Sequence, residues 1–210
     1  MKQLPTSHLK LYALCGVIAP ILFALIVVLE GFLAHGYSQM TQQVSDLGAY
    51  TLYGSYALLQ NLNFCAFGVL VIVFAIGLGK ELSASKAITV TLTLFGVAFF
   101  LLGFFPDEPM PWPGTAHYLI AWVGGFPLLF SELFSWRRLR SSSTDVNSGW
   151  AKYGSFSLVS LVLAVVSLIL YVTFGQQGSP VAGLLQRVFL GVLGLWIEVM
   201  ALKLLNRSKG

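Results

Sequence analysis

The sequence predicts an all-α protein that crosses a membrane six times. Three observations support this prediction: the composition, the number of long apolar runs and the placement of the basic residues. Of the 210 residues, 57% are hydrophobic and only 10% are charged, whereas soluble domains carry about 25% charged residues. So few charges cannot cover a soluble globule, and most of the surface must therefore face lipid.

Six apolar runs reach the length of about 20 residues that a spanning helix needs. Each run ends in a polar or turn-rich stretch, and lipid leaves no alternative to the helix because it cannot satisfy an open backbone. The first run is too long for the apolar region of a signal peptide, so we expect it to be retained. We expect one membrane domain over residues 1–210, with helices at about 11–33, 57–79, 87–105, 116–135, 154–174 and 183–205.

The basic residues alternate with these runs in a way that predicts the orientation. In the six-helix scheme, eleven of the twelve lysines and arginines fall on one side, and Arg187 is the exception. Because cytoplasmic loops collect Lys and Arg, we expect both termini in the cytoplasm and the chain in the plasma (inner) membrane. The net charge of +4 thus reflects topology, and a nucleic-acid partner is not predicted.

The connections on the opposite, outer side differ from one another. The first, about 34–56, is the longest and rich in tyrosine, which prefers the headgroup region. Within it, residues 44–59 are predicted to form a short interfacial helix with Ser45 or Asp46 as its N-cap. The second, 106–115, holds four prolines, and we expect a stiff lid because proline restricts the backbone.

Polar residues near the outer face form the candidate binding site. Ionisable groups are costly inside a membrane and usually face a cavity or a partner. They come from every long outer connection and from several helix ends, and we expect them to line an outward-facing polar pocket. The candidates are Glu30, Ser45, Asp46, Asn61, Asp107, His117 and Arg187.

Two chemical roles and two structural roles are open for these residues. Asp46, Asp107 and His117 could bind a divalent metal, since carboxylate and imidazole suit zinc, manganese or iron. His117 and an aspartate could instead act as an acid–base pair. Arg187 could pair with Glu30 or Asp107 and close the bundle, and all of these residues could merely cap helices. No cofactor is predicted, and a divalent metal is the weaker alternative.

Two acidic residues lie deeper in the predicted helices. Glu132 is expected to be a surface charge that reaches toward Arg137 and Arg138. Glu198 is expected to hydrogen-bond to another helix, because an unpaired carboxylate at that depth is costly. Cys15 and Cys65 lie on apolar helices without the spacing of a disulfide framework. The glycine pairs at 124–125 and at 191 and 194 favour close helix approach.

Several short motifs, taken in order, resemble one known family. They are Gly16-Val17-Ile18-Ala19-Pro20, Tyr37-Ser38, Val44-Ser45-Asp46-Leu47-Gly48, Asn61 with Phe64 and Gly68, Gly103-x-Phe105-Pro106-Asp107, and His117. This order resembles the domain of unknown function 998 family of bacterial and archaeal membrane proteins, over nearly the whole chain. The resemblance implies a six-helix membrane fold without an established activity. It also singles out Ser45, Asp46, Asn61, Asp107 and His117.

Together these observations predict a multi-pass membrane protein whose outer pocket binds or processes a small amphiphile or lipid. Membrane lipids and a small amphiphilic ligand are the expected partners. Two alternatives stay open: a non-catalytic accessory or assembly subunit, and a membrane-embedded metal-dependent hydrolase. A pocket protein should bring Asp46, Asp107 and His117 together, whereas an accessory subunit would use the polar residues only for capping and topology.

Overall fold

The fold is a bundle of six long helices in a computed structural model that describes residues 6–82, 85–108, 112–140 and 150–208. The long helices are α1 (Thr6–Leu33), α3 (Ala57–Glu81), α4 (Lys86–Leu102), α5 (Gly114–Arg140), α6 (Ala151–Phe174) and α7 (Ala182–Arg207). No strand occurs in the described part of the chain. The predicted all-α membrane bundle is therefore confirmed, with helix boundaries close to those expected.

Five of the helices in the described part of the chain are long and apolar enough to cross a membrane. The sixth, α4, is apolar but has 17 residues, the lower end of the range for a spanning helix. It ends at Leu102, earlier than predicted, and the amides of Phe104 and Phe105 close a turn onto the Leu101 carbonyl. The orientation of the bundle in the membrane remains a prediction.

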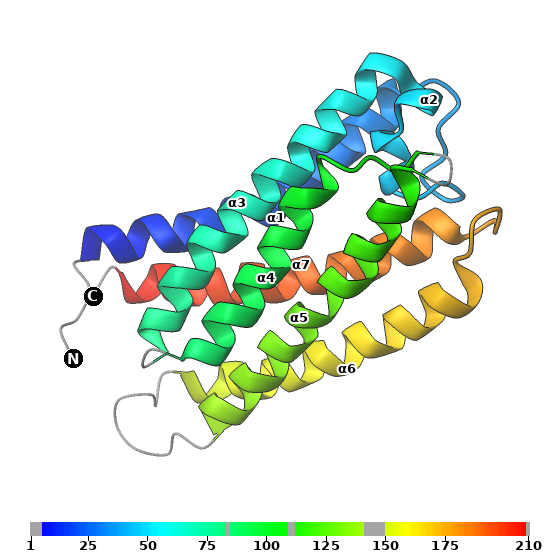
Figure 1. Ribbon diagram of the computed structural model, residues 1–210. Helices are drawn as coiled ribbons and strands as arrows, with labels where there is room; N and C mark the ends of the chain where they lie inside the picture. The colour runs from blue at the N-terminus through cyan, green and yellow to red at the C-terminus, as the bar shows by residue number, and fades with distance from the viewer. Residues whose placement is uncertain (1–5, 83–84, 109–111, 141–149, 209–210) are drawn as a thin grey trace.

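The long helices pack in a ring. Each helix contacts the next along the chain, α7 returns to contact α1, and α3 also touches α7 across the interior. The start of α1 and the end of α7 lie at one end of the bundle, here called the terminal end (Figure 1). The opposite end carries the short elements and the α4–α5 and α6–α7 connections, and is called the η1 end.

The predicted interfacial helix over 44–59 is wrong in its form. The chain there makes three short pieces, η1 (Ser45–Gly48), α2 (Tyr50–Tyr53) and η2 (Gly54–Tyr56). Gly54 has φ of 55°, a conformation that breaks a helix and that glycine adopts without strain. Val44 is the N-cap of η1 and makes no side-chain capping bond, so neither Ser45 nor Asp46 has the predicted capping role.

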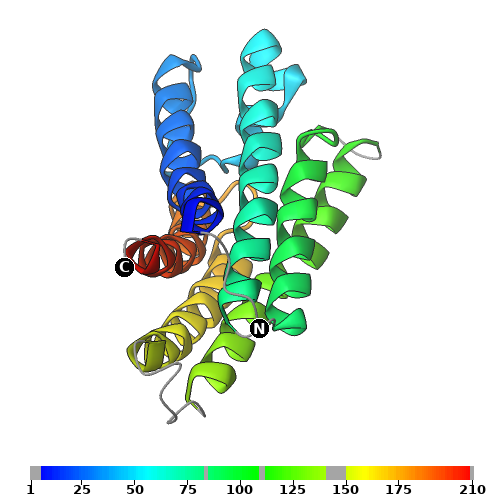
Figure 2. The same cartoon turned by 90° about the vertical axis from the view of Figure 1, so that its left-hand side faces the viewer.

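A cluster of phenylalanines fills the centre of the ring. Phe23 of α1, Phe67 of α3 and Phe99 of α4 pack with ring centroids 4.7 to 5.9 Å apart. Toward the η1 end some neighbouring helices separate: α5 and α6 lie close near the terminal end and diverge from there, as both views show (Figures 1 and 2). The interior is therefore dense in its middle and opens toward the η1 end.

Candidate functional site

The loop between α1 and η1 folds over the η1 end and is anchored by Arg187 of α7. The Arg187 guanidinium donates to the side chain and carbonyl of Gln39 and to the Gln42 and Gly183 carbonyls, each at 2.9 Å. It also donates to the Tyr37 hydroxyl and stacks on its ring. These bonds fix residues 37–44 against the start of α7 and thereby form one wall of a cavity.

That cavity lies between the diverging ends of α5 and α6, with a volume of about 400 Å³. Its lining combines one polar wall with an apolar floor. The floor includes Phe64, Phe99, Leu102, Trp122, Leu168 and Phe189. Ala121 and Trp122 of α5 line it while remaining exposed on the outer surface of the bundle. The cavity is thus open sideways, on a surface that lipid would cover in a membrane.

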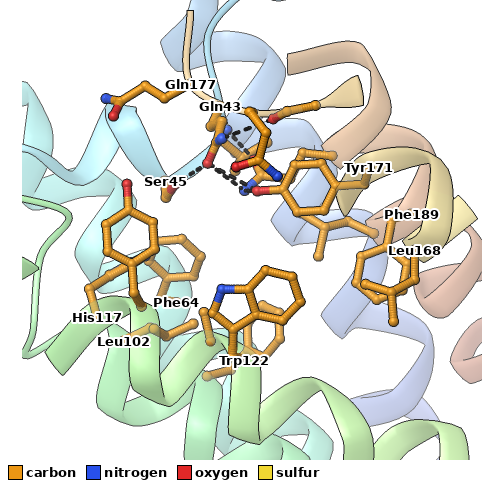
Figure 3. A pocket seen from close by; sticks show the side chains of 18 residues that line it. Gln43, Ser45, Phe64, Leu102, His117, Trp122, Leu168, Tyr171, Gln177 and Phe189 are labelled. Atoms are coloured by element: carbon orange, nitrogen blue, oxygen red, sulfur yellow. Dashed lines mark hydrogen bonds between the residues drawn. The ribbon is translucent and has the colours of Figure 1, made fainter. Parts of the chain in front are cut away.

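The polar wall is a network of amides and hydroxyls. The Gln43 side-chain oxygen accepts from the Tyr171 hydroxyl at 3.1 Å, from Gln186 at 3.4 Å and from the Ser45 hydroxyl at 3.5 Å. Gln186 in turn accepts from the Val44 amide at 2.5 Å. Figure 3 shows Gln43 and Tyr171 meeting on one side of the cavity, with Trp122 across from them. This wall is uncharged and offers both donors and acceptors.

His117 is buried at the start of α5 and lines the same cavity. Its Nδ1 lies 2.7 Å from the Phe105 carbonyl oxygen. Because a carbonyl can only accept, this contact requires the proton on Nδ1 and leaves Nε2 as an acceptor in the neutral ring. Among the described residues, no hydrogen bond involves Nε2. His117 therefore presents an unused acceptor in a site whose other groups bond to one another.

Asp46 and Asp107 lie behind the polar wall and do not line the cavity. The Asp46 carboxylate accepts from the Gln43 amide at 2.8 Å. The pKa of Asp46 is raised to about 6: burial is the largest cause and the nearby Asp107 adds to it, while the Gln43 bond and Arg187 oppose the rise. Asp107 is hydrogen-bonded to Tyr118, which does line the cavity. The two acids thus make the region behind the wall electronegative.

The other candidate residues have different environments from those expected. Asn61 donates to the Gly48 carbonyl at 2.9 Å and holds η1 onto α3, so it supports the loop and does not line the cavity. Glu30 is fully buried, and neither carboxylate oxygen has a hydrogen-bond partner in the described structure.

The expected pairing of Arg187 with Glu30 or Asp107 is wrong, since its partners are neutral oxygens. Only Ser45 and His117 of the seven candidates line this cavity.

The described residues assemble no set of metal ligands. Within the described ranges, no group of three or more His, Cys, Asp or Glu side chains is placed to hold a metal ion. Asp46, Asp107 and His117 are all described, and they face different partners: the Gln43 amide, Tyr118 and the Phe105 carbonyl.

Sequence reasoning missed the residues that build the polar wall. Gln43 and Gln186 are 143 positions apart, and nothing in their local sequence pairs them. The carboxylate of Glu108 accepts from the Tyr50 amide at 2.5 Å and from the Thr51 hydroxyl at 2.6 Å. It therefore ties the α4–α5 connection to the start of α2, where helix N-termini favour anions.

The two deeper acids also differ from expectation. Glu132 is fully buried and accepts from Ser160 of α6 at 3.1 Å, so its prediction as a surface charge is wrong. Glu198 was expected to bond to another helix. Its Oε2 atom is buried without a partner among the described residues.

No curated protein and no solved structure matches the chain. One protein family does match, over residues 17–203, which cover all six long helices except the ends of α1 and α7. The matched family is described as a protein of unknown function (DUF998), and the chain belongs to this family of multi-pass membrane proteins.

Proposed function

We propose that this protein binds a small amphiphile in the cavity between α5 and α6, as a carrier or receptor for a lipid-like molecule. The observation that carries the proposal is the division of the cavity into an uncharged polar wall and an apolar floor. Ligand sites are commonly mostly apolar, with a few placed polar groups that fix orientation. An amphiphile has the same division, since its headgroup is polar and its tail is apolar.

The chemistry of the wall narrows the class of headgroup. Gln43, Gln186 and Tyr171 supply neutral donors and acceptors, and His117 supplies the unused Nε2. Asp46 and Asp107 lie behind the wall, so an anionic headgroup would be repelled. The proposed ligand therefore has an uncharged, hydrogen-bonding headgroup that carries a hydroxyl or amide donor for His117.

The lateral opening suggests how the ligand reaches the site. Ala121 and Trp122 are exposed at the margin of the cavity, and the charge distribution predicts that the η1 end faces outward. The amphiphile would thus enter from the outer leaflet. It would slide between α5 and α6 with its alkyl part on Trp122 and Leu168.

The proposal can be tested by the lipids that remain with the purified protein. Ala121→Trp should fill the opening, whereas Leu119→Trp adds the same side chain at an α5 residue that is 62% exposed and does not line the cavity. Mass spectrometry of lipid extracts should find one uncharged amphiphile enriched over its share of the membrane in wild type and Leu119→Trp. Ala121→Trp should lose that enrichment.

The accessory-subunit alternative predicts a different result. If the polar residues serve only packing and capping, no amphiphile should be enriched, or Ala121→Trp should retain it as well as Leu119→Trp does. Either result would reject the binding proposal. Both variants must elute as monodisperse protein in detergent for the comparison to count.

A further inference from the structure

A second cavity lies on the other side of the bundle, between α1 and α7. Its volume is about 480 Å³. The wall toward the bundle interior is apolar and includes Phe67, Phe95 and Phe99. Ile21 and Val28 of α1 and Leu195 of α7 line the cavity and are 56%, 48% and 57% exposed. It is therefore a groove that opens on the lipid-facing surface, and we call it the α1–α7 groove.

The groove is separate from the cavity between α5 and α6. Val44, Phe99 and Leu190 line both and so form the partition between them. Near the terminal end, α1 and α7 approach closely, since a Cβ on Gly16 would lie 2.7 Å from the Ala201 Cβ. The groove widens from there toward the η1 end.

One stripe of α7 runs the length of the groove. Arg187, Gly191, Leu195 and Glu198 all line it, and their spacing places them on one helix face. Arg187 and Glu198 are eleven residues apart, about 16 Å at 1.5 Å per residue. A Cβ on Gly191 would meet no atom within 4 Å, so the middle of the stripe leaves open space. The groove is thus long, apolar along its middle and polar at its two ends.

The η1 end of the groove carries a positive charge that forms no direct ion pair with a described carboxylate, although Asp46 lies near enough to interact with it. The bonds of Arg187 go to amide, carbonyl and hydroxyl oxygens. The ion pair found within the described residues is a different one, between Arg207 and Glu81. Neutral acceptors solvate a guanidinium but do not cancel its charge, and within the described part of the chain Nη2 donates to the Tyr37 hydroxyl alone. An anionic oxygen at this point would gain a charge-assisted bond.

We propose that the α1–α7 groove binds one acyl chain of an anionic phospholipid from the surrounding bilayer, with the phosphate beside Arg187. In a membrane, lipid would surround the exposed side chains of Ile21, Val28 and Leu195. Phospholipid is therefore the nearest source of acyl chains. The unpaired guanidinium selects the anionic headgroup, and the glycine at 191 leaves room for the chain. Glu198 marks the far end of the apolar stretch.

The test fills the groove and compares the variant with a matched glycine substitution. Gly191→Phe places a ring in the groove, while Gly125→Phe adds the same ring on α5 at another glycine whose Cβ meets no atom within 4 Å. Gly125 lines neither cavity. Each protein is reconstituted into nanodiscs of equal phosphatidylglycerol and phosphatidylcholine with identical chains, and retained lipids are then counted by native mass spectrometry.

Wild type and Gly125→Phe should retain phosphatidylglycerol over phosphatidylcholine by about tenfold, and Gly191→Phe should lose this preference. Arg187→Gln removes both the charge and the bonds that hold residues 37–44, whereas Arg187→Lys loses most of those bonds but keeps the charge. Arg187→Gln should therefore abolish the preference for the anionic headgroup, and Arg187→Lys should retain it. Equal retention of the two lipids by wild type overturns the proposal. Unchanged retention by Gly191→Phe also overturns it, as does recovery of a free fatty acid in place of phospholipid.

The outcome is independent of the amphiphile site. Ala121→Trp alters the cavity between α5 and α6 and leaves the groove intact, so it should keep the phosphatidylglycerol preference. Gly191→Phe should in turn keep the uncharged amphiphile. Failure of one site therefore does not imply failure of the other.

Discussion

Asp46 and Arg187 show how single charged residues shape the η1 end. Each carries a charge in a partly buried position, and each is held by neutral groups: the Gln43 amide for Asp46 and loop oxygens for Arg187. Removing a charge from water is costly unless it is paired. For Asp46 the cost appears as a pKa of about 6, against 3.8 for an ordinary aspartate.

This raised pKa gives the protein a defined pH dependence. Because the folded pKa exceeds the unfolded one, the folded state binds the Asp46 proton more strongly, and its contribution to stability is lost as pH rises from about 4 through 6. Asp46→Asn keeps the acceptor for the Gln43 amide and removes the titration. It should raise Tm by a few degrees at pH 8 and leave Tm unchanged at pH 4.

Thermal unfolding in detergent at the two pH values measures this difference. Subtracting wild type from variant at each pH removes the contribution of the other titrating groups. An equal change in Tm at pH 4 and pH 8 would show that Asp46 is not desolvated in the folded protein.

At the scale of helices, small residues determine which faces can meet. The buried residues of α6 are all small: Gly154, Ser157, Ser160, Ala164 and Ser167. Such residues let membrane helices approach closely, and here they bring α6 onto Glu132 of α5 and Trp196 of α7. Backbone meets backbone where α3 crosses α4, and a Cβ on Gly68 there would lie 2.4 Å from the Gly96 carbonyl oxygen.

That crossing yields a prediction with an internal control. The methyl group added by Gly68→Ala would press against the backbone of α4. It should lower the free energy of unfolding by about 3 kcal/mol, at the upper end of overpacking costs. Gly125→Ala adds the same methyl group where no atom lies within 4 Å and should be neutral or slightly stabilising, since alanine favours helix. Denaturant unfolding in mixed micelles compares them, and equal stability of the two variants would contradict the α3–α4 crossing.

The helices were more predictable from the sequence than the contacts between them. All six long helices were predictable because a spanning helix needs a long apolar run, which is a local property. The 44–59 segment was not, because Gly54 and the bonds from Glu108 to α2 divide it. The burial of Glu132 was not predicted because hydropathy does not tell which side of α5 faces the bundle. The small residues of α6 are the sequence feature that indicates a buried face there.

The same limit applies to the candidate site. The sequence located the polar residues at one end of the bundle, and Ser45 and His117 do line the cavity there. The residues that complete the wall, Gln43, Tyr171 and Gln186, come from a loop and two helices distant in sequence. Their pairing depends on how the Arg187 bonds fold the 37–44 loop onto α7, which no local pattern encodes.

At the scale of the whole molecule, the bundle has two chemically different ends. The η1 end collects Asp46, Asp107, Glu108 and His117, while Lys80, Arg138 and Arg207 lie toward the other. The positive-inside rule therefore predicts that the η1 end faces out of the cell. This orientation determines the leaflet from which an amphiphile would enter.

Single-cysteine labelling checks the orientation. In a background with Cys15 and Cys65 replaced by alanine, His35→Cys at the η1 end should react with a membrane-impermeant maleimide on intact cells. Asn206→Cys at the terminal end should react only after the membrane is opened. Both positions are exposed, so the reverse pattern would place the η1 end in the cytoplasm.

A density map of the protein in native-lipid nanodiscs would show whether the cavity between α5 and α6 holds an amphiphile. We expect elongated density that begins at Gln43, Tyr171 and His117 and ends among Trp122 and Leu168. A cavity closed by protein side chains, or one that contains only isolated solvent peaks along the polar wall, would contradict it.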